Sequence, residues 1–441
     1  MDNLEHFSKQ YLLDTYARDY THFVRGEGAK LYTNEGVEYI DFTSGIGVNA
    51  LGHNHPKLVE SIAKQAQKVL HLSNLFYIDS QVRLAKKMTA LANQNMRVFF
   101  CNSGLEANEC AIKIARIYGE RFKIASSLRE SQSDSKQSNK MDCHDSTRCV
   151  ESRNDNESDL FNAYKNHRYK IITLKNSFHG RSIATLRACG QDKMHTHFSP
   201  FPKGFIYAEN ISDAIEKAKA DNAVVAIFIE LIQGEGGIYA LPKDEVAQLA
   251  DFCAKSDILL MVDEVQSGVF RSGAFLASNY YGIKPNVVTL AKGLAGGVPI
   301  GAVMCDKVDI FAPSQHGSTF GGNPLSTSAG MCALEVLEDY AKSGELAKHI
   351  AIFNAELNAI KDEFSSVVVG VSGVGFMRGL KIKDDETLGK IIAKARQNRL
   401  LVLRSGNATL RFLPPLLITK DEISTGFARL KATLKEIAVA I

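Results

Sequence analysis

The segment around Lys292 constrains this chain more than any other. An apolar, β-branched run over residues 287–291 ends at Lys292, and a glycine-rich stretch from Gly293 to Gly301 follows. Most lysines at strand ends are solvated, because burying an ammonium group without a partner is costly. When burial does occur, it lowers the lysine pKa and makes the free amine a nucleophile toward carbonyl groups. Lys292 is therefore a candidate nucleophile if matching groups lie near it.

A matching acid follows the apolar run Ile258–Val262, which has the length and composition of a buried parallel strand. The run leads into Asp263, Glu264, Val265 and Gln266. Open α/β sheets bind ligands beyond the carboxyl ends of their strands, although a single acid there could equally cap the next helix. A lysine and an acid at two such ends favour a Schiff-base lysine with a carboxylate on a pyridinium nitrogen, as in pyridoxal phosphate enzymes.

A strand, turn and helix pattern supplies a candidate phosphate site. Met96–Cys101 is predicted to be a strand, 102–104 a turn, and Leu105–Tyr118 a helix with apolar residues spaced by three and four. The unpaired N–H groups at a helix start, together with the positive end of its dipole, bind anions. From this pattern alone, an ordinary serine N-cap without a ligand is an equal alternative.

Length and charge exclude other classes. The chain has 441 residues, 45% hydrophobic and 23% charged, which is enough for a large core and predicts more than one lobe. With 52 basic and 49 acidic residues, the net charge of +3 disfavours nucleic acid or an anionic membrane as partner. No apolar run approaches the roughly 20 residues of a membrane span. The N-terminus carries acids and lacks a signal-peptide core, so a cytoplasmic location is expected.

Residues 126–166 differ from the rest, because they are rich in Ser, Asn, Asp and Lys and poor in large apolar residues. Such a segment cannot bury enough surface to offset its ordering entropy, so a flexible surface insertion is predicted. Cys143, His144 and Cys149 lie in it, but their spacing matches no standard zinc pattern, and no metal site is expected. The eight cysteines of the chain predict no disulfide framework.

Elsewhere strands and helices alternate. Residues 169–174 and 224–230 are predicted strands and Lys243–Lys255 a helix, which together predict an α/β fold with a mostly parallel sheet between helices. After about Pro324 the pattern turns helical and then gives short strands near residues 375–382, 401–403 and 410–412. A small α/β lobe is therefore predicted at the C-terminal end.

Eight stretches, in order along the chain, resemble the class III pyridoxal-phosphate-dependent aminotransferases of fold type I, and among them the acetylornithine aminotransferases. They include FFCNSGLEANECAIKIAR, NSFHGRSIATL, IELIQGEGGI, MVDEVQSGVFRSG, TLAKGLAGGVPIGAV and HGSTFGGNPLS. The resemblance implies an N-terminal segment, residues 1–60, that joins the small domain. It further implies a large cofactor-binding domain over residues 61–322, which carries the insertion, and a small domain over residues 323–441.

The resemblance also implies cofactor contacts. Lys292 would bind the cofactor aldehyde and then act as general acid and base, and Asp263 would pair with the pyridinium nitrogen. Gln266 would contact the phenolic oxygen, and Phe178 would stack on the ring, with plain core packing as its alternative. Further cofactor contacts are expected at Gly104, Leu105, Glu264, Val265 and, from the neighbouring subunit of a homodimer with shared sites, Thr319. Leu105 stands where the family usually has Thr or Ala, so only a backbone contact carries over.

Substrate contacts are implied in the same way. Arg181 would take the substrate α-carboxylate, and Arg411 a carboxylate of 2-oxoglutarate or glutamate. Glu230 is expected to pair with Arg411 while an amine donor is bound, and to release it for glutamate. Ser318 is expected near the acylated end of the donor.

The implied reaction moves the δ-amino group of N2-acetyl-L-ornithine to 2-oxoglutarate, giving N-acetyl-L-glutamate 5-semialdehyde and L-glutamate in arginine biosynthesis. Ile46 favours an acylated donor, because ornithine δ-aminotransferases tend to carry Tyr at this position. N-succinyl-LL-2,6-diaminopimelate, of lysine biosynthesis, is a plausible second donor. The alternatives are an ornithine or 4-aminobutyrate aminotransferase, a glutamate-1-semialdehyde-type mutase, and a non-catalytic binding protein.

Overall fold

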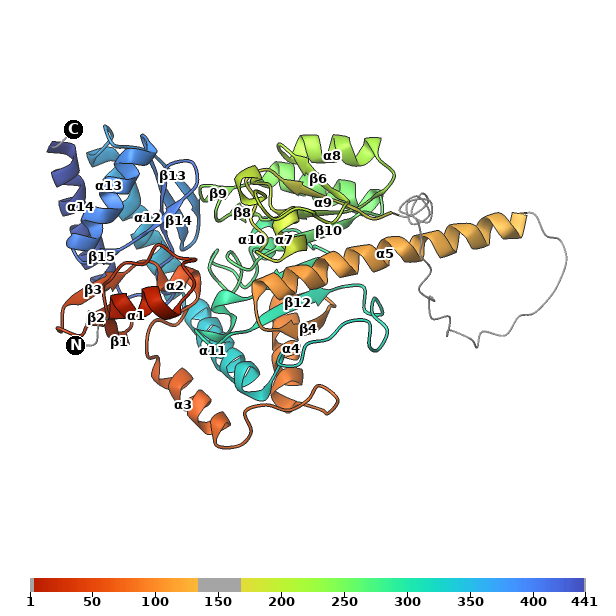
Figure 1. The fold of residues 1–441 in the computed structure, drawn as a ribbon, viewed down its shortest axis with the longest axis horizontal. Coiled ribbons are helices and arrows are strands. Elements are labelled where there is room, and N and C mark those ends of the chain that lie inside the picture. The colour runs from red at the N-terminus through yellow and green to blue at the C-terminus, as the bar shows by residue number, and fades with distance from the viewer. Residues whose placement is uncertain (1–3, 134–167, 440–441) are drawn as a thin grey trace.

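The computed structural model describes residues 4–133 and 168–439, and a seven-stranded sheet lies at its centre (Figure 1). The strand order is β4-β12-β11-β10-β7-β5-β6. The last five strands of this order pair in parallel, whereas β12 runs antiparallel to both β11 and β4. The predicted, mostly parallel sheet is therefore confirmed. The strands are β4 (Arg97–Cys101), β5 (Lys170–Leu174), β6 (Phe205–Ala208), β7 (Val224–Ile229), β10 (Leu259–Asp263), β11 (Val287–Leu290) and β12 (Gly301–Cys305).

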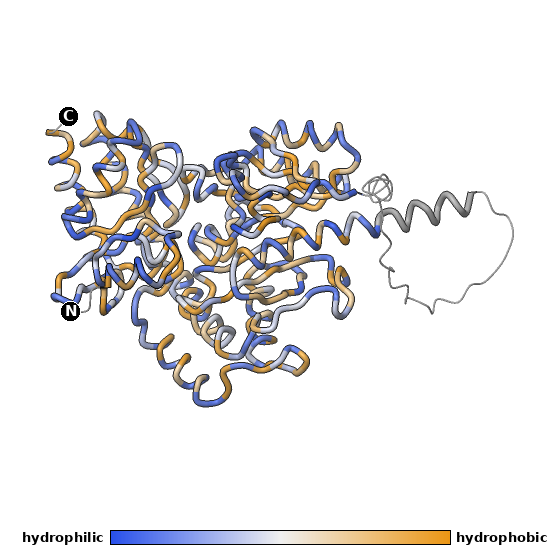
Figure 2. The backbone as a smooth tube through the Cα atoms, viewed as in Figure 1, coloured by the Kyte–Doolittle hydropathy of each residue, from blue (hydrophilic) through white to orange (hydrophobic). Residues whose placement is uncertain are grey.

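Helices cover both faces of this sheet because its strands are apolar on both sides. Every residue of β7, VVAIFI, is buried, and its side chains are divided between two core clusters. One cluster joins the sheet to α5 (Gly104–Ser133), and the other joins it to α8 (Ile211–Ala220) and α9 (Lys243–Lys255). Figure 2 shows the apolar residues concentrated in these central strands. Continuous burial explains why the strands were readable from sequence as unbroken apolar runs.

Helix α5 is longer than its sequence predicts. It runs from Gly104 to Ser133, whereas the apolar periodicity ends near Tyr118. The helix thus includes the first residues of the predicted polar insertion, because polar residues such as Glu, Lys and Arg are themselves good helix formers. The remainder of the insertion, including Cys143, His144 and Cys149, lies outside the described residues.

The first forty residues pack against the last hundred. Strands β1 (Phe23–Glu27), β2 (Lys30–Thr33) and β3 (Glu38–Asp41) form a sheet whose fourth member is β15 (Leu400–Leu401). Phe42, which follows β3, packs on Phe353, Phe412 and Phe427 with ring centroids 5.3–6.3 Å apart. The N-terminal segment therefore shares a core with the C-terminal part, as the expected domain arrangement requires.

A second four-stranded sheet, of order β13-β14-β17-β16, completes the C-terminal part. Its strands are β13 (Val368–Val374), β14 (Met377–Ile382), β16 (Leu403–Ser405) and β17 (Thr409–Phe412). The accompanying helices are α12 (Glu345–Glu363), α13 (Asp385–Gln397) and α14 (Lys420–Val439). Helix α11 (Pro324–Lys342) instead packs on α3 (Pro56–Ala66) and α4 (Asp79–Ala92). Helix α4 belongs to the predicted large domain, and α3 spans its predicted start. The domain boundaries near residues 60 and 322 stay a prediction.

The remaining elements are short or lie at the edges. They are α1 (Leu4–Tyr11), α2 (Ser44–Gly47), α7 (Ile183–Ala188), η1 (Asp192–Met194), β8 (Ile232–Gln233), β9 (Tyr239–Ala240), α10 (Ala277–Tyr281) and η2 (Lys292–Ala295). Among the described residues, no helix has both the length and the apolar character needed to traverse a bilayer.

Candidate active site

The carboxyl ends of three adjacent parallel strands bring the predicted lysine and acid together. Asp263 is the last residue of β10, Glu230 follows β7, and Lys292 lies two residues beyond β11. In the sheet Asp263 pairs with Thr289, and Val262 pairs with Ile229. A cavity of about 400 Å³ lies at this edge, and the side chains of Glu230, Asp263 and Lys292 all line it. The location agrees with the rule for ligand sites in open α/β sheets.

Most of the predicted site residues reach this cavity, and four do not. Its lining includes Gly104, Leu105, Phe178, Arg181, Glu230, Asp263, Val265, Gln266 and Lys292. Glu264, Ser318, Thr319 and Arg411 are absent from the lining of the cavity formed by this single chain. Three further lining residues that the sequence did not single out carry polar chemistry: Asn108, His179 and Glu235.

Lys292 begins the short helix η2 in the left-handed backbone region, at φ 44°. This conformation is uncommon for a residue with a side chain and is found most often at functional sites. Desolvation by the cavity walls and, to a smaller extent, the Arg411 guanidinium lower the pKa of Lys292 to about 8, although Glu235, Asp263 and Glu230 act in the opposite direction. About a tenth of this amine is therefore uncharged at pH 7 and able to attack a carbonyl group, far more than for an ordinary lysine.

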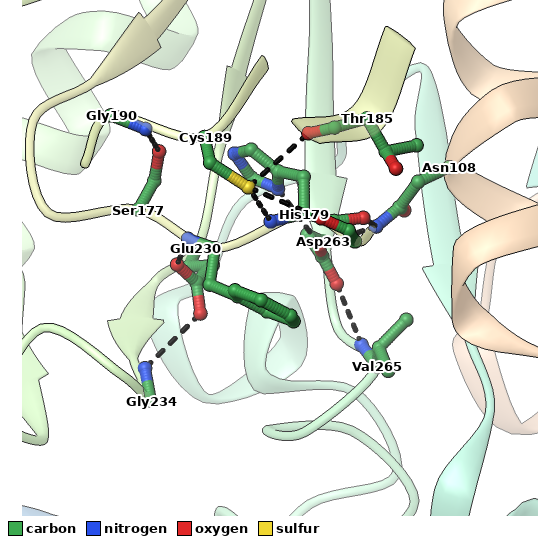
Figure 3. Close-up of polar contacts among 12 residues, drawn as sticks. Asn108, Ser177, His179, Thr185, Cys189, Gly190, Glu230, Gly234, Asp263 and Val265 are labelled. Atoms are coloured by element: carbon green, nitrogen blue, oxygen red, sulfur yellow. Dashed lines mark hydrogen bonds and ion pairs between the residues drawn. The ribbon is translucent and has the colours of Figure 1, made fainter. Parts of the chain in front are cut away.

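Three donors hold the Asp263 carboxylate (Figure 3). Its Oδ2 accepts hydrogen bonds from Asn108 Nδ2 and His179 Nδ1, both at 2.8 Å, and its Oδ1 accepts one from the Val265 N–H at 3.0 Å. Hydrogen bonds of this kind stabilise the charged form of a carboxylate. Asn108 lies one helical turn after Gly104 on the same face of α5, a spacing that could have identified it from sequence.

The start of α5 is free to bind an anion. The Ser103 Oγ caps the Glu106 N–H at 3.2 Å, while the amides of Gly104 and Leu105 belong to the first turn, which has no intrahelical acceptors. Gly104 is required here, because a Cβ on it would lie 2.6 Å from Val265. The close approach places these amides beside the segment that follows Asp263.

The side-chain amide of Gln266 has an unsatisfied atom at the cavity. Its Oε1 is buried and has no hydrogen-bond partner among the described residues. A Cβ on Gly234 would lie 2.5 Å from this atom, so glycine makes room for the amide. The cavity thus offers helix-start amides, a side-chain amide, a carboxylate and an amine. These match the phosphate, phenolic oxygen, ring nitrogen and aldehyde of pyridoxal phosphate, so the residues present fit that cofactor.

Glu264 requires a correction, since the sequence predicted it as a cofactor contact. Its buried carboxylate accepts hydrogen bonds from the N–H groups of Ala277 and Ser278 and from the Ser278 hydroxyl. These groups form the start of α10, so Glu264 anchors that helix and does not line the cavity. Burial raises the pKa of this carboxyl to about 7.

The predicted pairing of Glu230 with Arg411 is also wrong. Glu230 accepts the N–H groups of Phe178 and Gly234, at 2.9 and 3.1 Å, so its carboxylate is occupied by backbone. Arg411, on β17, instead pairs with Glu235 at 2.5 Å. The Gly234 carbonyl accepts a second bond from the same guanidinium at 3.2 Å. A glutamate of this IQGEGG loop therefore holds Arg411, and the sequence offered the wrong one of two acids only five positions apart.

The ion pair separates Arg411 from the cavity. The Arg411 side chain is 4% exposed and does not line the cavity, whereas Glu235 lines it and is 34% exposed. Burial raises the pKa of the neighbouring Glu230 to about 7, and the Asp263 charge adds to this effect. Arg181 is exposed and lies 5.8 Å from the Phe178 ring centroid.

Ser318 and Thr319 lie beside the turn that precedes α5, with Ser318 partly buried. The Ser318 Oγ accepts hydrogen bonds from Asn102 Nδ2 at 3.2 Å and from the Gly321 N–H at 3.0 Å. Thr319 is exposed. Ile46 is 44% exposed and does not line the cavity either, although Val48 does.

In the cofactor-free protein, we expect Lys292 to be reductively methylated by formaldehyde with a pH midpoint near 8, because only the neutral amine attacks. Peptide mass spectrometry across a pH series measures the extent of modification. Lys342 is the internal control, because its hydrogen bond to Glu338 raises its pKa, and it should react only at higher pH. Equal midpoints for the two lysines would contradict the environment described for Lys292.

Comparison with known proteins supports this chemistry. The family model Aminotransferase class-III matches residues 15–434. The acetylornithine aminotransferase of Wolinella succinogenes is 46% identical over 98% of this chain and 100% of that protein. The one from Caldanaerobacter subterraneus is 40% identical over 98% of this chain and 99% of that protein.

Solved structures agree. The ornithine aminotransferase of Toxoplasma gondii ME49 has a TM-score of 0.84 at 27% identity, covering 99% of this chain and 96% of its own. The N-acetylornithine aminotransferase of Stenotrophomonas maltophilia has a TM-score of 0.74 at 30% identity, covering 99% and 100%. These matches confirm the predicted fold type I and pyridoxal phosphate as the cofactor. The chain belongs to the class III aminotransferases.

Proposed function

We propose that this protein transfers the δ-amino group of N2-acetyl-L-ornithine to 2-oxoglutarate, giving N-acetyl-L-glutamate 5-semialdehyde and L-glutamate for arginine biosynthesis. One observation carries the proposal: Lys292 and Asp263 line the same cavity. Burial lowers the pKa of the Lys292 amine, and three hydrogen-bond donors hold the Asp263 carboxylate. The relatives named acetylornithine aminotransferase, 46% and 40% identical over nearly the whole chain, support the choice of donor.

Bound pyridoxal phosphate supplies a reactive carbonyl group and an electron-withdrawing ring. Lys292 would hold the cofactor through its aldehyde, and the Lys292 amine would serve as the acid and base for the proton on the δ-carbon of the donor. Asp263 Oδ1, which among the described residues accepts only the Val265 N–H, would pair with the ring nitrogen. The amides of Gly104 and Leu105 bind the phosphate, and the Gln266 amide binds the phenolic oxygen. Phe178 covers the ring, and Glu230 fixes Phe178 through its backbone.

Donor specificity is the direct test of this function. Rates are compared for N-acetylornithine, ornithine, N-succinyl-LL-2,6-diaminopimelate and 4-aminobutyrate, with glutamate formation from 2-oxoglutarate as the readout. We expect kcat/KM for N-acetylornithine to exceed that for ornithine and 4-aminobutyrate by about tenfold or more, as the acetylornithine aminotransferases similar to this chain suggest. Preference for ornithine would reassign the enzyme as an ornithine aminotransferase. Turnover without glutamate formation would indicate a mutase.

The ion pair of Arg411 with Glu235 explains how one cavity takes two differently charged substrates. While Glu235 neutralises Arg411, the cavity presents no free cation at this end to an amine donor. When Glu235 turns away, the guanidinium is left for the second carboxylate of 2-oxoglutarate or glutamate. The exchange replaces one carboxylate by another, so no buried charge is left unpaired. Arg181, exposed and close to Phe178, binds the α-carboxylate.

Glu235→Gln should slow the half-reaction with N-acetylornithine by about tenfold or more and largely spare the half-reaction with 2-oxoglutarate, because Arg411 then lacks its neutralising partner. Single-turnover absorbance changes of the bound cofactor measure each half separately. Glu209→Gln, which removes a surface partner of Lys175, is the matched control and should leave both rates unchanged. Equal losses in both halves would contradict the switch.

A homodimer with shared sites is part of the proposal. Leu70, Leu75, Phe76, Tyr77 and Phe320 are 55–99% exposed. They lie together, because Asn74 Nδ2 donates to the carbonyls of Ser318 and Gly321 at 3.0 and 2.9 Å, and the rings of His71 and Phe320 are 5.3 Å apart. An apolar surface of this kind marks an interface between proteins. Covering it with a second copy brings Thr319 to the phosphate in the neighbouring cavity.

Subunit complementation tests the shared site. Thr319→Ala is expected to weaken cofactor binding, and Lys292→Ala to abolish turnover. A mixed dimer of the two variants contains one site with Lys292 from one chain and Thr319 from the other. Activity after co-expression should therefore exceed the sum of the two parent variants. Without such a gain, Thr319 would have to act within its own chain or not at all.

A further inference from the structure

We propose that His179 is a positioning residue for Asp263, and that it acts as a neutral hydrogen-bond donor that fixes the carboxylate without compensating its charge. The inference rests on the proposed pairing of Asp263 with the cofactor ring nitrogen. In this proposal, His179 supports Asp263 and leaves the carboxylate of Asp263 fully negative.

The geometry around His179 leaves little freedom. The imidazole side chain is 0% exposed, and its Nδ1 lies 2.8 Å from Asp263 Oδ2. The ring stacks on Phe228, with centroids 4.3 Å apart and planes inclined by 18°. Asn108 Nδ2 donates to the same Oδ2 at 2.8 Å and to the His179 carbonyl at 2.6 Å. With two side-chain donors on Oδ2, the carboxylate is oriented so that Oδ1 keeps a free lone pair.

The second ring nitrogen identifies the protonation state. His179 Nε2 is buried and has no hydrogen-bond partner among the described residues. Because a carboxylate only accepts, the hydrogen must be on Nδ1. A second hydrogen, on Nε2, would give the ring a positive charge and leave a buried donor without an acceptor. This state costs more free energy than a neutral ring whose Nε2 lone pair has no donor. The imidazole is therefore neutral.

The backbone of the same segment is fixed as well. The His179 N–H donates to Cys189 Sγ at 3.1 Å, and the preceding Phe178 N–H donates to Glu230 at 2.9 Å (Figure 3). Two consecutive amides thus hold the residue that supports the acid and the residue that covers the ring. An imidazolium in this place would share the Asp263 charge, whereas a neutral donor leaves it for the ring nitrogen.

The test compares pyridoxal phosphate with its 1-deaza analogue, in which C–H replaces the ring nitrogen. Dissociation constants are measured by absorbance titration of the full-length, cofactor-free protein. His179→Leu should raise the dissociation constant of pyridoxal phosphate about tenfold and leave that of the analogue nearly unchanged. Only pyridoxal phosphate has a ring nitrogen that pairs with Asp263. His179→Asn, whose amide lies near the position of Nδ1, should stay close to wild type with both ligands.

His179→Gln places its amide beyond the Nδ1 position and should behave like the Leu variant, so it replaces that variant if Leu prevents folding. Equal weakening of both ligands would show that His179 only fills space, and an Asn variant as weak as Leu or Gln would show that a neutral donor is insufficient. Either result overturns the proposal. If the wild type itself binds both ligands equally, the pairing of Asp263 with the ring nitrogen fails, and the proposal falls with it.

Discussion

The pairing of β10 with β11 is the constraint on which the site depends. Because the two strands are parallel and Asp263 is in register with Thr289, the acid and the amine of Lys292 leave the sheet at the same edge. Neither charged group is stable there alone, since burial penalises both. Hydrogen bonds from Asn108, His179 and Val265 stabilise the acid, whereas Lys292 responds to burial by losing its proton more readily.

Much of this arrangement was predictable from sequence. The buried strands appear as continuous apolar runs, so β7, β10 and β11 were placed to within about one residue, and the residues just after them mark the edge where ligands bind. The family resemblance then assigned roles to most of the cavity lining. The ends of the predicted strands locate the site because all strands of a parallel sheet end at the same edge.

The missed features depend on contacts between distant segments. Periodicity does not reveal that Glu264 points toward α10 or that Glu235, rather than Glu230, reaches Arg411, because each result depends on how loops cross above the sheet. His179 and Asn108 escaped notice for the same reason, since their partner Asp263 is 84 and 155 positions away. The length of α5 was underestimated because hydropathy marks only the part of a helix that packs.

The Arg411–Glu235 pair joins two parts of the molecule whose segments lie far apart in the sequence. Arg411 belongs to the C-terminal sheet, whereas Glu235 lies between β8 and β9, and the Gly406 N–H bonded to the Glu235 carbonyl adds a second link. Exchanging Glu235 for a ligand carboxylate therefore also alters how firmly these parts are fastened to one another. Under the proposed exchange, the choice of substrate and the attachment of these parts would be coupled, so substitutions between them, remote from the chemistry, would change which acid binds.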